Sequence, residues 1–203
     1  MRFCKLFVFS REMQTDKIKV FFYNVGMFTY LLLFLNVAIF ALIKMDKLDP
    51  GYLGTSYHNV FNRREYYRIL SGAFTHLEIL HLFFNMSSLV NVGTFVEGYF
   101  GSVRMLVIYF VSMILGRLLA LFIRHANHDD YTESIGASGA ICGLLGAYFL
   151  VILYYYGASA LPSLVRPLVS LVIMSILPGV DGTSHFCCMA VGMAVTFLMM
   201  MAG

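Results

Sequence analysis

A serine and a histidine, each at the start of a long apolar run, are the residues whose types and positions could do chemistry. Ser138 stands in the sequence Gly136-Ala137-Ser138-Gly139, and His185 follows 47 residues later. A serine hydroxyl becomes an effective nucleophile when an adjacent base accepts its proton. The two residues could therefore form a hydrolytic site, provided that the fold brings the starts of these runs together.

The composition predicts an all-α membrane protein. Hydrophobic residues make up 60% of the 203 residues, charged residues only 12%, and the mean hydropathy is +0.78. Soluble domains carry about 25% charged residues, and a lone span can satisfy its backbone in lipid only as a helix. The net charge of +3 without a dense basic run argues against a nucleic-acid partner. The four cysteines form neither a disulfide framework nor a zinc-site spacing.

Six apolar runs are candidates for membrane spans, which need about 20 residues each. They cover residues 21–43, 77–96, 105–123, 138–156, 161–177 and 185 to the end of the chain. The fifth is the weakest, because it contains Pro162, Arg166 and Pro167. The first eighteen residues lack the continuous apolar core of a signal peptide. We therefore expect a polar segment over residues 1–20 and a six-helix membrane domain over residues 21–203.

The strongly polar residues of the runs lie at matching ends. His76, His81 and Asn85 stand at the start of the second run, Ser138 starts the fourth, and His185 starts the sixth. Even-numbered spans enter the membrane from the same side, so these residues should share one side and a shallow depth. His81 and Asn85, four residues apart, share a helix face. Polar groups within spans are costly and usually functional.

Small residues predict close contact between the fourth and sixth spans. Gly139 and Gly143 form a small-xxx-small pair, continued by Gly146 and Ala147, and Cys188 and Gly192 repeat the pattern below His185. Small residues let membrane helices approach closely, as a serine–histidine hydrogen bond of about 2.6–3.2 Å requires. The same glycines could equally serve helix packing alone.

The ordered set of motifs resembles the rhomboid family of intramembrane serine proteases, from about Tyr66 to the C-terminus. The resemblance rests on His76-x4-His81-x3-Asn85, on Gly136-Ala137-Ser138-Gly139, on His185 with Gly192 behind it, and on Glu97 with Gly101-Ser102-x-Arg104. It implies an all-α polytopic fold, a six-transmembrane-helix rhomboid-like bundle.

The resemblance also implies residue roles. Ser138 would be the nucleophile and His185 the general base, while His81, Asn85 and the backbone N–H of Ser138 would bind the oxyanion. His76, Gly136 and Gly139 would support the site.

The resemblance further implies partners and location. The site would use no cofactor and no metal. The partners would be the lipid bilayer and single-span membrane proteins cut in or near their transmembrane segments. We expect a multi-pass protein of the plasma membrane or an endomembrane rather than of the mitochondrion.

Two features depart from the family pattern, whereas the lack of a third catalytic member agrees with it. Tyr67-Arg68 replaces a Trp-Arg pair but keeps an aromatic ring and a cation, which we expect to anchor the first loop at the membrane interface. Cys187-Cys188 replaces paired glycines, which predicts looser contact between the fourth and sixth spans. No acidic residue is obviously placed as a third member, because Asp181 and Glu133 look like loop residues. A Ser–His dyad is therefore expected.

Three other interpretations are a catalytically silent binding protein, a small transporter or channel, and a metal site. A catalytically silent rhomboid-like protein that binds or routes membrane clients has no need to retain both Ser138 and His185. A small transporter or channel usually shows internal repeats and helices interrupted at the midplane, and neither is visible in the sequence. His76, His81 and His185 could bind a metal, but no carboxylate or thiolate stands suitably beside them.

Arg117 and Arg166 are basic residues within the predicted spans. Long basic side chains near the ends of spans extend toward the headgroups, and we expect both arginines to do so.

Overall fold

The protein is helical throughout the part that the structure describes. The structure is a computed structural model that describes residues 26–175 and 181–202, in which the only β pairing is an isolated bridge between Thr55 and Ser134. The predicted all-α class is confirmed. The long helices are α2 (Met27–Lys44), α4 (Ile79–Ser88) continuing through η3 (Leu89–Gly93) into α5 (Thr94–Phe100), α6 (Ser102–Ala126), α7 (Ser138–Tyr156), α8 (Leu161–Ser175) and α9 (Gly182–Ala202).

Five helices of the described residues are long and apolar enough to cross a membrane. They cover residues 27–44, 79–100, 102–126, 138–159 and 182–202, with hydropathy between 1.4 and 2.4. The chain is therefore a multi-pass membrane protein, as predicted. In the region of the predicted fifth span the structure has α8, which is 15 residues long and contains Pro167. The predicted N-terminal polar segment, the first residues of the first span and residues 176–177 lie outside the described residues.

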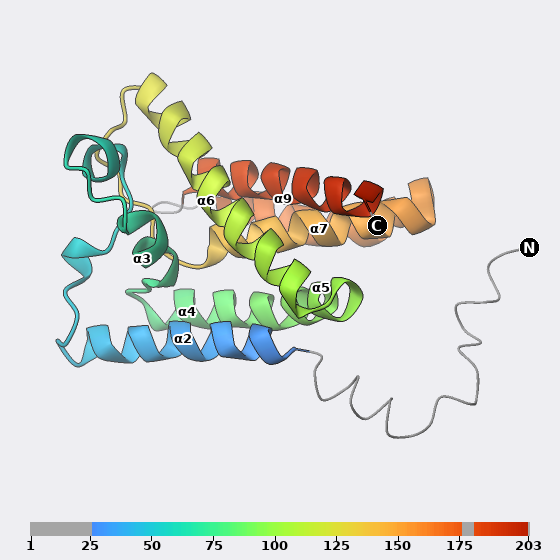
Figure 1. The fold of residues 1–203 in the computed structure, drawn as a ribbon, viewed down its shortest axis with the longest axis horizontal. Coiled ribbons are helices and arrows are strands. Elements are labelled where there is room, and N and C mark those ends of the chain that lie inside the picture. Colours follow the sequence, from blue (N-terminus) through green and yellow to red (C-terminus); the bar gives the residue numbers. More distant parts are fainter. Residues whose placement is uncertain (1–25, 176–180, 203) are drawn as a thin grey trace, which may run out of the picture.

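The three helices that carry the predicted site residues begin at the same end of the molecule. In Figure 1, α4, α7 and α9 all start at the left, whereas α2 runs the opposite way beside α4. Helix α6 crosses the molecule at a slant and packs against both α7 and α9. The order of the spans therefore places the polar helix starts together, as the sequence predicts.

Helices α7 and α9 pack backbone to backbone. A methyl group added at Gly192 would overlap the carbonyl of Gly143, and one added at Gly146 would overlap the carbonyl of Met189. The predicted loosening by Cys187-Cys188 is wrong. Cys188 is fully buried between α6 and α7: a methyl at Gly116 would lie 2.5 Å from its Cα, and one at Gly139 would lie 3.1 Å from its Sγ. The glycines on α6 and α7 therefore make the room that a glycine on α9 would otherwise provide.

The long first loop contains three short helices and a buried arginine. Arg68 is only 1% exposed. Its Nε donates to Glu65 Oε2 (2.6 Å), and its Nη1 donates to the carbonyls of Gly51 and Gly54 (3.0 and 3.2 Å). The prediction that Arg68 anchors the loop at the membrane interface is therefore wrong, because its hydrogen bonds join separate parts of the first loop. Tyr67, by contrast, is exposed. The short helices are η1 (Pro50–Tyr52), η2 (His58–Asn62) and α3 (Arg68–Phe74).

A second buried charge joins α2 to the turn between α5 and α6. The carboxylate of Glu97 accepts hydrogen bonds from the backbone N–H groups of Phe28 (3.1 Å) and Thr29 (3.0 Å). It also accepts from the hydroxyls of Thr29 (2.7 Å) and Ser102 (2.8 Å). The first N–H groups of a helix have no intrahelical partner and favour negative charge. Glu97 therefore fixes the start of α2.

Candidate active site

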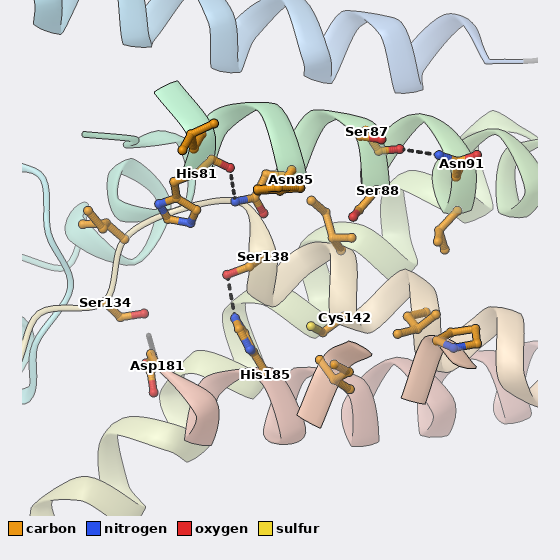
Figure 2. A pocket seen from close by; sticks show the side chains of 18 of the residues that line it. His81, Asn85, Ser87, Ser88, Asn91, Ser134, Ser138, Cys142, Asp181 and His185 are labelled. Atoms are coloured by element: carbon orange, nitrogen blue, oxygen red, sulfur yellow. Dashed lines mark hydrogen bonds between the residues drawn. The ribbon is translucent and has the colours of Figure 1, made fainter. Parts of the chain in front are cut away.

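The side chains of Ser138 and His185 meet at the starts of α7 and α9. Ser138 Oγ lies 2.8 Å from His185 Nε2, and the imidazole is only 5% exposed. Figure 2 shows the two side chains pointing toward one another. When Nε2 carries no proton, the serine hydroxyl donates to it. The distance is that of a serine paired with a base, whereas the roles of nucleophile and base stay predictions.

The pair lines a pocket of about 560 Å³ that extends between α4, α7 and α8. Ligand sites commonly have volumes of about 300–1,000 Å³. The wall farther along α4 and η3 includes the polar residues Ser87, Ser88 and Asn91. Asn91 Nδ2 donates to the carbonyl of Ser87. The pocket is therefore large enough for a short stretch of polypeptide.

The segment before Ser138 is held by hydrogen bonds from three other parts of the chain. Thr55 and Ser134 exchange two backbone hydrogen bonds (3.1 and 2.8 Å), and the N–H of Gly136 donates to the carbonyl of Gly72 (2.8 Å). Arg117 Nη2 donates to the carbonyl of Gly136 (2.7 Å), and its Nη1 donates to Thr55 Oγ1 (3.0 Å). Hydrogen bonds to the first loop, to α3 and to α6 therefore fix the backbone that leads to Ser138.

Arg117 is the main correction to the expected site. Its side chain is 2% exposed, near the middle of α6, and does not extend to the headgroups. The sequence signal was present, since a cation inside an apolar run is usually functional. The carbonyls that it binds come from segments far away in the sequence. The side chain of Arg166 lies outside the described residues.

Gly136 allows a histidine ring to lie against the backbone. Its φ is +100°, a conformation that side chains rarely adopt. A methyl group there would lie 2.7 Å from Cε1 and 2.8 Å from Nε2 of His81. The two rings of His76 and His81 are edge to face with centroids 5.0 Å apart. Gly136 therefore serves both the turn and the approach of His81.

His76 contacts the same turn. The N–H of Ala137 donates to His76 Nε2 at 3.4 Å. Burial, with smaller contributions from the neighbouring His81 and Arg117, lowers the pKa of His76 from 6.5 to about 4. The ring is therefore neutral at pH 7, and Nε2 is free to accept this hydrogen bond.

The predicted oxyanion donors surround Ser138. His81 and Asn85 lie on α4, on the opposite side of Ser138 from His185 (Figure 2). Asn85 Nδ2 donates to the carbonyl of His81 (2.9 Å), which leaves a second amide hydrogen free. Ser138 is the first residue of α7, where backbone N–H groups have no intrahelical partner. Their role in oxyanion binding stays a prediction.

Gly139 serves a helix contact in the structure. A methyl there would lie 3.1 Å from Cys188 Sγ and 3.4 Å from Ser184 Oγ. Gly139 therefore lets α9 approach next to Ser138.

The second ring nitrogen of His185 contacts a residue that the sequence analysis missed. Ser175 Oγ lies 2.9 Å from His185 Nδ1. The two carboxylates considered as third members are bonded elsewhere. Asp181 accepts from the N–H of Ser184 (3.0 Å) and from Arg124 Nη1 (3.3 Å), and Glu133 accepts from Asn59 Nδ2 (2.7 Å). Nothing in the spacing of the sequence marks Ser175.

In residues 26–175 and 181–202, no three His, Cys, Asp or Glu side chains gather closely enough to hold a metal ion.

The fold and the site define a polytopic helical membrane protein with a serine–histidine pair at its helix starts. The rhomboid domain family matches residues 63–202, and the chain belongs to the rhomboid family.

The named relatives include one called a protease and one called inactive. The chain is 32% identical to the rhomboid protease GluP of Bacillus subtilis over 75% of its own length and 30% of that protein. It is 40% identical to inactive RHOMBOID-like protein 8 of Arabidopsis thaliana over 46% of its length and 25% of that protein. It is 30% identical to RHOMBOID-like protein 5 of Arabidopsis thaliana over 73% of its length and 49% of that protein. The chain thus spans between a quarter and a half of these relatives.

Proposed function

We propose that the protein is an intramembrane serine endopeptidase that uses a Ser138–His185 dyad. The observation that carries the proposal is the 2.8 Å contact between Ser138 Oγ and His185 Nε2 inside the pocket. Membership of a family that includes a named protease supports the same reaction. We propose that the membrane domain covers residues 21–203, following a polar segment over residues 1–20.

In the first half of the reaction, His185 Nε2 accepts the hydroxyl proton as Ser138 Oγ attacks the carbonyl carbon of the scissile peptide bond. The protonated His185 then donates that proton to the leaving amine, and an acyl-enzyme remains on Ser138. In the second half, His185 takes a proton from water, the hydroxide attacks the ester, and the proton returns to Ser138.

The negative oxygen of the tetrahedral intermediate needs donors that are in place before the charge forms. His81, the free amide hydrogen of Asn85 and the N–H of Ser138 are the candidates beside the nucleophile. Each donor stabilises the developing charge more strongly in a partly water-excluded site than it would in water. Losing one such donor lowers the rate about 10²–10³-fold. The fixed segment before Ser138 keeps its N–H in position.

The proposed substrates are single-span membrane proteins, cut in or near their transmembrane segments. Apolar side chains of α4, α7 and α8 line most of the pocket, including Phe84, Leu145 and Leu171. Such a wall suits an unwound stretch of an apolar helix, with its carbonyl at Ser138.

Cleavage of a single-span substrate by purified protein in proteoliposomes tests the proposal. We expect Ser138→Ala and His185→Ala each to abolish cleavage, since the dyad acts as a unit. We also expect a fluorophosphonate probe to label Ser138 in wild type and to fail in both variants. The exposed Ser159→Ala and His128→Ala are matched controls and should behave like wild type. Cleavage by the Ser138→Ala protein at the wild-type rate would overturn the assignment.

A catalytically silent client-binding protein is the second candidate. It is favoured by the likeness to inactive RHOMBOID-like protein 8. Wild-type protein that retains a client in a pull-down yet neither cleaves it nor reacts with the probe would establish this alternative.

A further inference from the structure

The imidazole of His185 lies between two hydroxyl groups from two other helices. Ser138 on α7 contacts Nε2 at 2.8 Å, and Ser175 at the end of α8 contacts Nδ1 at 2.9 Å. Both lengths are those of hydrogen bonds. The proposed dyad explains the first contact and gives no role to the second.

We infer that Ser175 is a positioning residue, which holds His185 in the tautomer that can act as a base toward Ser138. A neutral imidazole carries its proton on one nitrogen only. With the proton on Nδ1 and donated to Ser175 Oγ, the lone pair of Nε2 faces the Ser138 hydroxyl. The inference rests on the proposed function, because it assigns a partner to the proposed base.

The contact with Ser175 matters most when His185 is charged. After proton transfer from Ser138, both ring nitrogens carry hydrogen, so Nδ1–H must donate and the Ser175 hydroxyl must accept. Hydrogen bonds from a charged donor are about twice as strong as neutral ones. Ser175 therefore stabilises the charged ring more than the neutral ring, which makes His185 a better base.

No carboxylate of the described residues takes the place of this hydroxyl. Asp181, the acidic group nearest to the ring in sequence, is occupied by the N–H of Ser184 and by Arg124. The ionisable groups that face His185 from the packed elements are Asp181, His81 and Arg117. None of them changes in the variants proposed below, so a change in pH dependence reports on Ser175.

Close packing brings the Ser175 hydroxyl within reach of the ring. A methyl group added at Gly182 would lie 2.5 Å from the carbonyl oxygen of Ser175 and 3.2 Å from its Cβ. The absent side chain at the start of α9 thus lets the end of α8 lie directly against it. The position of Ser175 is set by the same helix that carries His185.

The test has two readouts, applied to wild type, Ser175→Ala and Ser175→Thr. The first is the ¹⁵N chemical shifts of the His185 ring, assigned with a His185→Gln spectrum, which report the tautomer without any reaction. The second is the pH profile of kcat and KM for cleavage.

We expect Ser175→Ala to lose the Nδ1-protonated tautomer and to cut with a kcat about 10- to 100-fold lower, as for loss of a hydrogen bond to a charged group. KM should stay unchanged, and the acidic limb of the profile should move to lower pH. Ser175→Thr keeps a hydroxyl and should restore both readouts. Ser184→Ala is the matched control, because its buried hydroxyl faces Cys188 and not the ring.

The outcomes separate this inference from the proposed function. Unchanged ring shifts in Ser175→Ala would overturn the positioning role, whatever the activity. A loss of kcat that Ser175→Thr does not restore, with an unmoved acidic limb, would overturn it too. If Ser175→Ala changes the tautomer of His185 while the wild-type protein neither cleaves a substrate nor reacts with the probe, the positioning role is supported and the protease is rejected.

Discussion

The two sides of Ser138 are built in different ways. On the loop side, residues 134–137 are held by backbone hydrogen bonds to Thr55 and Gly72 and by the guanidinium of Arg117. On the helix side, His185 is held by one side-chain contact to Ser175 and by close packing of α9 on its neighbours.

The difference separates two requirements of the proposed reaction. The loop side leads to Ser138, the proposed nucleophile, whose hydroxyl and N–H must not move as charge develops. The helix side holds the proposed base, which changes protonation state and needs a partner that accepts whenever Nδ1 carries a proton. We therefore expect changes on the loop side to act mainly through geometry, and changes on the helix side to act mainly through proton transfer.

Among variants that keep both Ser138 and His185, the largest effect is expected from Gly136→Ala on the loop side. The added methyl would lie 2.7 Å from the His81 ring, at a φ of +100°. His81 or the turn must then shift, and displacing one oxyanion donor costs about 10²–10³ in kcat. The steady-state cleavage assay measures this loss.

Gly101→Ala is the control that separates backbone strain from contact. Gly101 also has a positive φ, of +82°, but nothing lies within 4 Å of the added methyl. It should lose stability without a comparable loss of kcat. Equal losses of kcat in the two variants would show that strain, and not the approach of His81, explains Gly136.

A smaller effect is expected from Gly192→Ala, which tests the packing that carries the helix side. The methyl would overlap the carbonyl of Gly143, so α9 must move away from α7. Overpacking of this kind costs about 1–3 kcal/mol, and we expect a lower Tm with cleavage reduced about tenfold. Ala190→Val adds volume on the exposed face of α9 and should change neither. A wild-type Tm for Gly192→Ala would contradict the tight contact.

The smallest effect at neutral pH is expected from His76→Gln, which keeps an acceptor for the N–H of Ala137. The pKa of His76 is lowered by burial to about 4, whereas the unfolded chain titrates at its ordinary value of 6.5. The unfolded state therefore binds more protons between these values, and wild-type stability should fall as the pH drops from about 6.5 to 4. The loss is at most about 3 kcal/mol.

Thermal unfolding in detergent between pH 4 and 7 measures this dependence. We expect the Tm of His76→Gln to fall less steeply than that of wild type as the pH drops. Parallel curves for the two proteins would show that other groups carry the pH dependence.

The sequence predicted the features that depend on the length of the apolar runs and on the order of the spans. Apolar runs located the helices, with α7 beginning and ending as expected, and the order of spans placed Ser138 and His185 at the same end. The assignment of α8 as a full span was harder, because Pro167 and polar residues interrupt a run that is already short.

The sequence did not predict contacts made by long side chains to distant backbone. Arg68 and Arg117 were expected at the membrane interface, yet both are buried and bind carbonyl groups. Carbonyl partners leave no trace in residue type, so neither contact has a signature. Ser175 is invisible for a similar reason, since its role depends on how α8 meets α9 and not on any spacing.

The bridge between Thr55 and Ser134 links the first loop to the segment that carries the proposed nucleophile, Ser138. Thr55 and Gly72 form backbone hydrogen bonds with the extended stretch that ends at Gly136, two residues before Ser138. A displacement of the loop is thus transmitted to Ser138, the proposed nucleophile, through peptide groups, without first bending any of the long helices. A ligand bound to the loop would therefore shift the hydroxyl of Ser138 from a distance.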